Sequence, residues 1–361
     1  DFALSLKKLM SGVEDVFDYP HQLDAETPAF LQYTSGSTGK PKGALHVHSA
    51  IADMKHSFRE IMQLEEDDLY WCTADPAWIT GLVYGIIAPF STAVHQLQFS
   101  GTYNADSWLR ILEEKKVNIW YTAPTALRML MQEDENRFQE HDFSSLKRMY
   151  SVGEPLNPEI YHWGKKVFHV EIYDNWWQSE TGSMMIANRP PMAVNPGSMG
   201  IPRSGIEAMI YTEEMKPAAA GEQGYLCLRK GWRSMFRTYY RNDAAYADKF
   251  KGDIYYTGDL AYKDADGYFW YVSRADDVIN TAGHLVGPFE VESALIEHPA
   301  VAEAAVIGIP DETAGEVVKA FVTLKAGFTA GEALERELRG HARKRLGPAV
   351  APREIVFRDS L

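Results

Sequence analysis

The sequence contains little cysteine, no long apolar run and no excess of basic residues. Only Cys72 and Cys227 occur in 361 residues, which excludes a disulfide-built scaffold and favours two buried thiols in a reducing cytoplasm. No apolar run reaches the roughly eighteen residues of a membrane span. A formal net charge of −14 argues against nucleic acid as the main partner, although a local basic loop can still bind an anion.

A glycine-rich stretch, YTSGSTGKPKG at residues 33–43, is the densest feature of the chain. Glycine tolerates the positive φ that lets several backbone N–H groups converge, and the hydroxyls together with Lys40 and Lys42 add donors and charge. Such a loop suits a polyphosphate, but glycine content alone is equally compatible with a flexible surface loop. It is not the loop of P-loop NTPases, because Pro41 follows Gly39 and Lys40.

Strands and helices alternate over the first two hundred residues, which predicts an α/β fold layered around a largely parallel sheet. The first predicted helix carries Ile51, Met54 and Phe58 at spacings of three and four, with Ser49 as its expected N-cap. Ligands of such sheets bind beyond the carboxyl ends of the strands. The predicted helices span 49–63, 106–116 and 125–133, and the predicted strands span 69–71, 117–121, 146–152 and 170–173.

The pattern changes in the second half of the chain. Short β segments at 225–228, 253–256 and 268–272, with a hairpin turn at 264–267, predict a β-rich subdomain over about 200–275. A compact α/β unit follows at 276–361. It has a helix starting at Pro288, strands at 301–309 and 317–324, and a last helix carrying Leu334, Leu338, Ala342 and Leu346. We expect a domain spanning 1–275 and a second one spanning 276–361.

Five motifs occur in an order that resembles one enzyme family. The glycine-rich loop is followed by SVGEP at 151–155, YDNWWQSETG at 173–182, YTGD at 256–259, and a segment from Ser273 to Glu292. Each is weak alone, but together they resemble the adenylate-forming enzymes, which comprise acyl-CoA synthetases, luciferases and peptide-synthetase adenylation domains. The resemblance implies an α/β fold with a large layered N-terminal domain, a β-rich subdomain and a small mobile C-terminal α/β domain.

The resemblance also implies a site for ATP or AMP. Joining an anionic carboxylate to an anionic α-phosphate requires charge neutralisation and an in-line approach. Lys42 and Arg274 would supply positive charge, and Glu180 would act in catalysis through Mg²⁺ held with the phosphates. The implied nucleotide-binding residues are Thr34, Ser35, Gly36, Ser37, Thr38, Gly39, Lys42, Gly153, Glu154, Pro155, Asp174, Asn175, Trp176, Gln178, Ser179, Asp259 and Arg274.

The segment WWQSETG is most similar to that of the acetyl-CoA synthetases within this family. There the second tryptophan closes the acyl pocket, so Trp177 implies acetate or propionate as the acid, with Ile79, Thr80 and Val152 as the other pocket residues. Coenzyme A would be the second substrate. Gly283 and Arg343 match its contacts, and Asp276 matches the hinge about which the C-terminal domain rotates.

The chain departs from the family pattern in ways that leave alternatives open. Leu285 stands where the family commonly has an arginine for the AMP phosphate, and the family's adenylation lysine would lie beyond Leu361. Sequence expected before the glycine-rich loop also falls short, so we expect an incomplete chain. A medium-chain or aryl-CoA synthetase and a catalytically silent nucleotide-binding homologue remain alternatives. His46 and His48 have strand spacing, but no third metal ligand lies near them in sequence.

Overall fold

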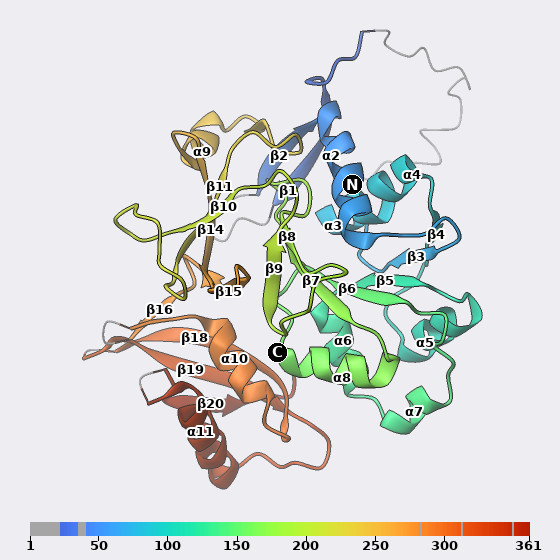
Figure 1. Cartoon of the computed structure of the whole chain (residues 1–361). Coiled ribbons are helices and arrows are strands. Elements are labelled where there is room, and N and C mark those ends of the chain that lie inside the picture. The colour runs from blue at the N-terminus through green and yellow to red at the C-terminus, as the bar shows by residue number, and fades with distance from the viewer. Residues whose placement is uncertain (1–21, 35–40, 282–283, 312, 349) are drawn as a thin grey trace, which may run out of the picture.

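The computed structural model describes residues 22–34, 41–281, 284–311, 313–348 and 350–361 (Figure 1). Its largest element is a twelve-stranded mixed sheet. One half of this sheet is parallel, as predicted, and includes all four strands expected in this region. Its strands, in spatial order, are β4 (His95–Leu97), β3 (Leu69–Cys72), β5 (Ile119–Thr122), β6 (Arg148–Ser151) and β7 (Ile172–Trp176).

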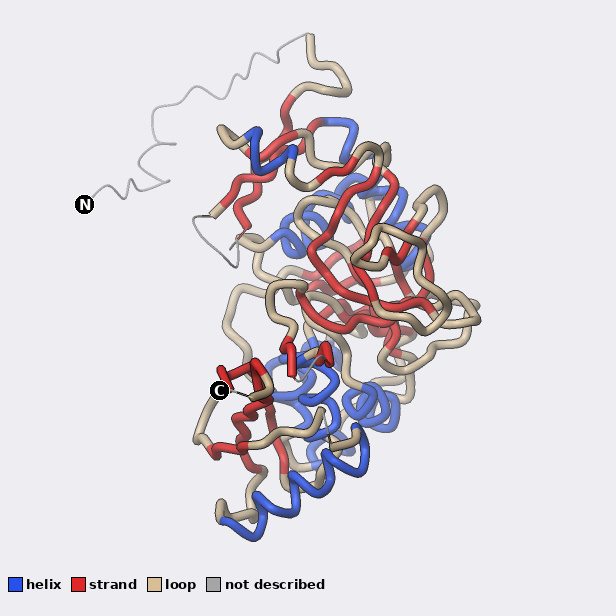
Figure 2. The backbone as a smooth tube through the Cα atoms, turned by 90° about the vertical axis from the view of Figure 1, so that its left-hand side faces the viewer, coloured by secondary structure: helices blue, strands red, loops and turns tan. Residues whose placement is uncertain are grey.

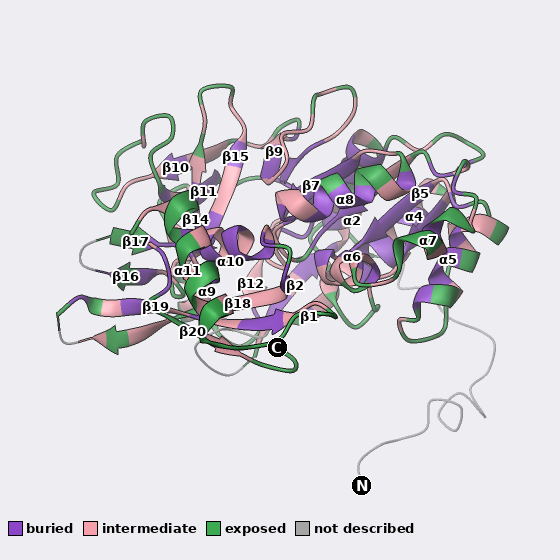
Figure 3. Ribbon diagram, turned by 90° about the horizontal axis from the view of Figure 1, so that it is seen from below, coloured by how far each residue is buried: buried purple, intermediate pink, exposed green. Residues whose placement is uncertain are grey.

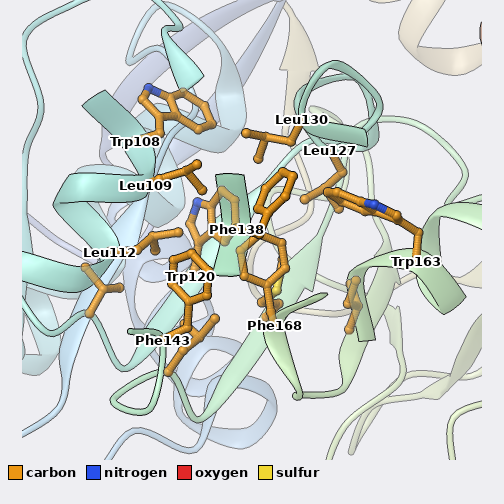
Figure 4. Close-up of a cluster of buried hydrophobic side chains, with 14 of the residues drawn as sticks. Trp108, Leu109, Leu112, Trp120, Leu127, Leu130, Phe138, Phe143, Trp163 and Phe168 are labelled. Carbon is orange, nitrogen blue, oxygen red and sulfur yellow. The ribbon is translucent and has the colours of Figure 1, made fainter. Parts of the chain in front are cut away.

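Both faces of the parallel half are buried, because successive side chains of each strand point to opposite sides. Trp120 faces one hydrophobic cluster, and its neighbour Tyr121 faces the other. Figure 4 shows Trp120 and Phe168 within the first cluster, beside side chains of the covering helices. Those helices are α5 (Ala105–Glu114), α6 (Pro124–Met131), α7 (Glu135–Gln139) and α8 (Pro158–Phe168).

The opposite face is covered by α2 (His48–Met62), the π-helix η1 (Val83–Ile87) and α4 (Ala88–Thr92). Each apolar side chain that these helices bury contributes about 1.5–3 kcal/mol, so burial on both faces fixes the sheet in the interior. Figure 3 shows the buried residues concentrated along the strands. None of the helices in the described part of the chain combines the length and the apolar character needed to cross a bilayer.

Helix α2 matches the predicted span, but Ser49 is not its N-cap. The helix begins at His48, directly after strand β2 (Lys42–Val47), and its first backbone donors bond to backbone oxygens. His48 N donates to Thr27 O at 3.0 Å and Ser49 N to Ala25 O at 2.8 Å. The preceding segment therefore satisfies the donors that a capping side chain would otherwise serve.

The other half of the large sheet is antiparallel, so the prediction of a largely parallel sheet holds for only part of it. The β-rich region is hydrogen-bonded into this same sheet through the pairing of β15 with β9. Gly267 has φ +90° in the predicted turn, as an αL position requires. The strands are β8 (Ile186–Ala187), β9 (Ser198–Pro202), β15 (Phe269–Arg274), β14 (Ile254–Lys263), β11 (Gly224–Arg229), β10 (Ala208–Tyr211) and β13 (Phe250–Lys251).

A small separate sheet holds the two ends of the glycine-rich loop. Strand β1 (Pro28–Thr34) pairs antiparallel with β2, and Thr34 stands opposite Lys42. Strand β12 (Thr238–Tyr239) pairs with the other edge of β2. The described ends of the loop are thus held side by side, and the Lys42 end also lies against Tyr239.

The C-terminal unit forms its own layered α/β structure (Figure 2). The fold class expected from the sequence is confirmed, and Pro288 is the first residue of α10 (Pro288–Ile296). Asn157, which directly precedes α8, donates to Ser293 of α10 at 2.7 Å, and this bond joins the unit to the layer of helices that covers the large sheet. Its other elements are β16 (Ile279–Thr281), β17 (His284–Val286), β18 (Val301–Asp311), β19 (Gly315–Leu324), α11 (Glu332–Leu346) and β20 (Glu354–Phe357).

Candidate active site

Two adjoining cavities lie where the parallel strands end. The polar cavity, of about 220 Å³, is lined by Asp174, Asp259 and Arg274 among others. The aromatic cavity, of about 610 Å³, is lined by Trp78, Trp108, Tyr121 and other residues. The two cavities share one wall, so a molecule in one cavity can contact a molecule in the other. The shared wall consists of Val152, Gly153, Glu154, Trp177 and Gln178.

The position of this wall follows from the topology. Residues 152–155 come directly after β6, and residues 177–182 come directly after β7, its parallel neighbour. Carboxyl ends of neighbouring parallel strands meet at one edge of a sheet, which is where ligands of such sheets bind. Gly153 has φ +94°, and a Cβ built there would meet nothing within 4 Å. The backbone conformation, and not lack of space, is thus what favours glycine.

Asp259 is the most densely bonded carboxylate of the polar cavity. Its Oδ2 accepts hydrogen bonds from Trp176 Nε1 and Gln178 Nε2, each at 2.9 Å. Its Oδ1 accepts from Arg274 Nη1 at 2.8 Å. Burial raises the pKa of Asp259 above its ordinary value, while the charge of Arg274 opposes that shift. A carboxylate has about four acceptor positions, so a diol can bond twice only if one of these donors moves.

Asp174 has one carboxylate oxygen left without a donor. Its Oδ2 lies 3.4 Å from Leu156 N, whereas its buried Oδ1 has no hydrogen-bond partner among the described residues. Burial raises the pKa of Asp174 to about 8. Because an unpaired polar atom is costly in the interior, this oxygen is suited to a hydrogen bond with a ligand.

Glu180 lies in the loop after β7 and is held from the opposite side by Tyr239. The Tyr239 hydroxyl donates to Glu180 Oε1 at 2.6 Å, and Lys42 Nζ lies 5.5 Å from the centre of the Tyr239 ring. Phe236 N also donates to the Glu180 carbonyl at 2.9 Å. The start of β2, the loop after β7 and β12 therefore meet at this carboxylate, with its second oxygen bonded to none of the described side chains.

His46 secures the backbone behind Glu180. Its Nε2 lies 2.8 Å from Ser179 O and its Nδ1 3.1 Å from Ser234 O, and its ring stacks on Phe30 with centroids 4.8 Å apart. Burial lowers the pKa of His46 to about 4. Since both nitrogens face backbone carbonyls and His48 already begins α2, the two histidines do not share a strand face as their spacing suggested.

The aromatic cavity brings together the four residues predicted for the acyl pocket. Ile79 and Thr80 begin α3 (Ile79–Leu82), and Val152 and Trp177 come from the shared wall. The Trp177 ring packs edge-on against Tyr84 of η1, with centroids 5.0 Å apart and planes at 88°. An indole fixed in this way separates the Ile79 side of the cavity from the polar cavity.

Other predicted residues serve the framework or lie elsewhere. Asn175 accepts from the Tyr121 hydroxyl and donates to Ser151 O. The Glu154 carboxylate is bound by Thr125 and Arg128 of α6. Arg343 is exposed on α11 and lines neither cavity, so the structure does not bring it to this site. Ser35, Gly36, Ser37, Thr38, Gly39 and Gly283 lie outside the described residues.

Two further predicted features lie near the entry to the C-terminal unit. Asp276 Oδ1 lies 3.6 Å from Arg274 Nε, next to the Asp259 network. Leu285 is 44% exposed on β17 and contributes no charge. Leu285 therefore does not supply the positive charge that the family pattern predicts at this position.

Sequence reasoning missed several residues that line or face the site. Met199 and Tyr271 line the polar cavity, and Tyr239 holds Glu180. Lys249 also faces the charged cluster around Glu180 and Asp259. The pairings β15–β9 and β12–β2 bring Met199, Tyr271 and Tyr239 in from distant segments, whereas Lys249 directly precedes the local β13–β14 hairpin.

The motifs, the two cavities and the folded units together define a family, and comparison with known proteins supports the same one. A model described as AMP-binding enzyme matches residues 5–240, and one described as AMP-binding enzyme C-terminal domain matches residues 290–361. The chain belongs to this family of AMP-binding enzymes.

Among curated proteins, the chain is 47% identical over 340 residues to the acetyl-coenzyme A synthetase of Bacillus subtilis (strain 168). It is 40% identical over 365 residues to the acetyl-coenzyme A synthetase of Pyrobaculum aerophilum. These matches cover 94% and 97% of this chain but 59% and 54% of the two relatives. The chain thus spans little more than half the length of the curated relatives it matches.

Solved structures with the same fold include two CoA ligases. The anthranilate CoA ligase AuaEII in complex with anthranoyl-AMP is 33% identical, with a TM-score of 0.85 over 92% of this chain and 64% of that one. The benzoate CoA ligase from Burkholderia xenovorans LB400 is 27% identical, with a TM-score of 0.88 over 98% of this chain and 70% of that one.

Proposed function

We propose that this chain carries the site of an ATP-dependent acid–thiol ligase that activates a short carboxylic acid, acetate or propionate, in the cytoplasm. The single observation that carries the proposal is the shared wall, which places a cavity with carboxylates and Arg274 next to one walled by Trp177. A nucleotide in the first and an acid in the second would meet at Val152 and Gly153. The identity to acetyl-coenzyme A synthetases supports acetate as the acid.

The reaction would proceed in two steps. A carboxylate oxygen attacks the α-phosphorus of ATP, the bond to the β-phosphate breaks, and acyl-AMP and pyrophosphate form. The thiol of coenzyme A then attacks the acyl carbon and AMP leaves with the bonding electrons. Two anions must approach in the first step, so fixed positive charge contributes most there. Lys42, beside Tyr239, and Arg274, beside Asp259, would supply it.

In the polar cavity, Asp259 would bind the ribose diol and Asp174 would accept a hydrogen bond from the adenine amino group. The free Oδ1 of Asp174 supports the second role. Asp259 is pre-oriented by Trp176 and Gln178, but three donors already occupy it. Binding of the diol would therefore displace one of them, and Arg274 is the donor best placed to turn toward a phosphate.

The residues present fit a magnesium ion at Glu180. Mg²⁺ in phosphate-binding sites takes one or two carboxylates and completes its shell with phosphate oxygens and water. Glu180 has one oxygen bonded to Tyr239, and the other is free of described partners. When bound there, the ion would neutralise part of the charge of the phosphates. Tyr239 would keep the carboxylate facing them.

The volume of the aromatic cavity leaves room for more than a short acid. A water molecule occupies about 30 Å³ in the liquid, and the cavity measures about 610 Å³. We assign the part near Ile79 and Trp177 to the acid and the remainder to the thiol-bearing arm of coenzyme A. The same volume favours a second candidate, an aryl-CoA or medium-chain ligase, and the likeness to anthranilate and benzoate CoA ligases supports it.

Acid-dependent exchange of pyrophosphate into ATP tests the proposal. Protein expressed from the complete gene is assayed with acetate, propionate, octanoate, benzoate and anthranilate. We expect exchange with acetate or propionate at least about ten times faster than with the others, since each misplaced methylene costs about 1–3 kcal/mol. Thioester should then appear on addition of coenzyme A.

The other outcomes separate the alternatives. Faster exchange with benzoate, anthranilate or octanoate would identify the second candidate and exclude the first. Binding of ATP without exchange for any acid would identify a silent nucleotide-binding homologue, the alternative suggested by Leu285 in place of the expected arginine.

A further inference from the structure

Lys249 is held at a fixed place beside the polar cavity. It lies between α9 (Asp243–Ala247) and β13, and both of its backbone groups are bonded. Lys249 N donates to Tyr246 O at 3.1 Å, and Lys249 O accepts from Tyr256 N at 2.8 Å. The backbone from which its side chain leaves is therefore fixed by the strand that carries Asp259.

The side chain of Lys249 runs inward and meets Arg274 at Gly258. A Cβ built on Gly258 would lie 3.6 Å from Lys249 Nζ and 3.1 Å from Arg274 Nη2. Gly258 has φ +84°, so the backbone turns here and exposes the space in which the two cationic groups converge. This point is immediately before Asp259, at the edge of the polar cavity.

The acids around Lys249 already have other partners among the described residues. The charged groups facing it are Glu180, Asp259, Arg274 and Lys42, and Arg274 also lies 3.6 Å from Asp276. Both acids are already engaged, Asp259 by Arg274 and Glu180 by Tyr239. Lys249 itself forms no direct ion pair with any residue that the structure describes.

A half-buried ammonium group in this position is costly without an anion. Burial is the main reason why the pKa of Lys249 lies below its ordinary value; Arg274 and Lys42 lower it further, while Glu180 and Asp259 oppose the shift. The acids of this cluster are bonded to Tyr239 and Arg274, and Lys249 is left without a direct partner among the described residues. An ammonium group in this position suits a ligand that carries several negative charges.

We propose that Lys249 is a further anion-binding residue of this site, which contacts the phosphate chain of the nucleotide during acid activation. This inference rests on the proposed function. Lys249 keeps its proton throughout and breaks no bond. It stabilises the negative charge that moves from the α-phosphorus to the departing pyrophosphate, and it thereby supplies charge that Leu285 cannot.

The competing explanation is structural, since Lys249 could serve only to offset Asp259 and Glu180 during folding. The two explanations differ in which step they affect. A phosphate contact acts on binding of ATP and release of pyrophosphate, whereas a folding role lowers both half-reactions together with thermal stability.

The test compares Lys249→Gln and Lys249→Arg with a neighbouring control, Lys251→Gln, in protein expressed from the complete gene. Lys251 is exposed, and its Nζ lies 4.9 Å from the centre of the Tyr256 ring. We expect Lys249→Gln to lower kcat/KM for ATP in pyrophosphate exchange by about 100-fold, the loss typical of removing one preorganised donor. Lys249→Arg should recover part of this loss, and Lys251→Gln should stay within twofold of the unaltered protein.

The second half-reaction is measured separately from preformed acetyl-AMP and coenzyme A. It should change less than threefold in Lys249→Gln, because pyrophosphate takes no part in it. The proposal is overturned if Lys249→Gln exchanges at a rate within twofold of the unaltered protein. It is also overturned if both half-reactions and the Tm fall together, which identifies the folding role.

Calorimetric binding of Mg·ATP and of pyrophosphate keeps this inference separable from the proposed function. If the unaltered protein exchanges with no acid, the proposed ligase activity fails, but Lys249→Gln should still bind both probes at least about tenfold more weakly. Equal binding by the variant and the unaltered protein would refute the role of Lys249 whatever the activity.

Discussion

The two cavities differ in how they can recognise a ligand. The polar cavity presents carboxylates in fixed orientations. Asp259, for example, is bonded to Trp176, Gln178 and Arg274. The aromatic cavity presents the rings of Trp78, Trp108, Tyr121 and Trp177 together with aliphatic and some polar side chains, and Trp177 packs on Tyr84. One side can select by hydrogen bonding and the other chiefly by volume.

This difference has an energetic consequence. A site built to bond polar groups rejects a ligand without them by several orders of magnitude, because its own buried groups are left unpaired. A pocket defined by volume discriminates by only about 10- to 200-fold per methylene. We therefore expect the nucleotide to be specified tightly and the acid loosely, and three variants test this contrast.

The largest effect is expected for Asp259→Ala. Loss of the carboxylate removes the proposed ribose contact, leaves Trp176 Nε1 without its acceptor and leaves Gln178 Nε2 with only the Thr257 carbonyl. We expect kcat/KM for ATP in pyrophosphate exchange to fall by about 100-fold or more, mostly through KM. Asp253→Ala, whose carboxylate pairs with Lys230 at the surface, is the matched control. An unaltered KM for ATP would remove Asp259 from the nucleotide site.

Stability must be measured alongside, because Asp259 is also half of an ion pair with Arg274. Breaking a fully buried pair costs about 3–5 kcal/mol, but the Arg274 side chain is 36% exposed. We therefore expect a smaller loss in the free energy of unfolding, which urea denaturation would measure. Asp259→Asn preserves an acceptor for Trp176 and should be more stable than the alanine variant while still binding ATP weakly.

A smaller effect, on selectivity, is expected for Trp177→Gly. Removing the indole joins the volume it occupied to the Ile79 side of the aromatic cavity. The ratio of kcat/KM for hexanoate to that for acetate should rise by about 10- to 100-fold, from the gain of one or two methylene contacts. Trp270→Gly is the control, since Trp270 stacks on Tyr262 and lines neither cavity. An unchanged ratio would show that Trp177 does not bound the acid.

The smallest effect on turnover is expected for Asp174→Asn, which instead alters the dependence of stability on pH. The pKa of Asp174 is about 8 in the folded protein against an ordinary 3.8, so between these values the native state holds a proton that the unfolded chain has released. Its contribution to stability is therefore full below about pH 4 and falls as the pH rises toward 8.

The asparagine variant should lose this part of the pH dependence, which amounts to at most about 1.4 kcal/mol per pH unit. The free energy of unfolding measured at pH 5, 6.5 and 8 would show it as a flatter profile. Asp253→Asn, at an exposed carboxylate, should keep the original slope. A variant with the original slope would mean that Asp174 is already ionised in the folded protein.

Local patterns were enough to predict much of the fold. The predicted helix at 49–63 and strands at 117–121 and 317–324 lie within a few residues of α2, β5 and β19, because their periodicity reflects burial on one or both faces. The N-cap at Ser49 was wrong because residues 25–27 satisfy the helix donors instead. That contact depends on a chain crossing which no local pattern encodes.

The site likewise contains residues that local patterns predicted and residues that they did not. The four residues predicted for the acid pocket line one cavity. Val152 and Trp177 directly follow parallel strands, and Ile79 and Thr80 begin the helix that comes after another parallel strand. Tyr239 was not predicted, because it reaches Glu180 only through pairing of distant strands. Lys249 was not predicted because no motif marks it, although it directly precedes the β13–β14 hairpin that carries Asp259. The domain boundary at 275/276, the hinge at Asp276 and the coenzyme A contacts stay predictions.

The sequence by itself determined the family, the alternation of buried strands and helices, and the kinds of side chain available for a charged ligand. These properties are local, since they depend on residue spacing and on the chemistry of single motifs. Only the tertiary structure decided which acceptors are already occupied, which are free, and which cations have no direct partner among the described residues. Those properties depend on segments far apart in the chain, as the meeting of Lys42, Glu180 and Tyr239 illustrates.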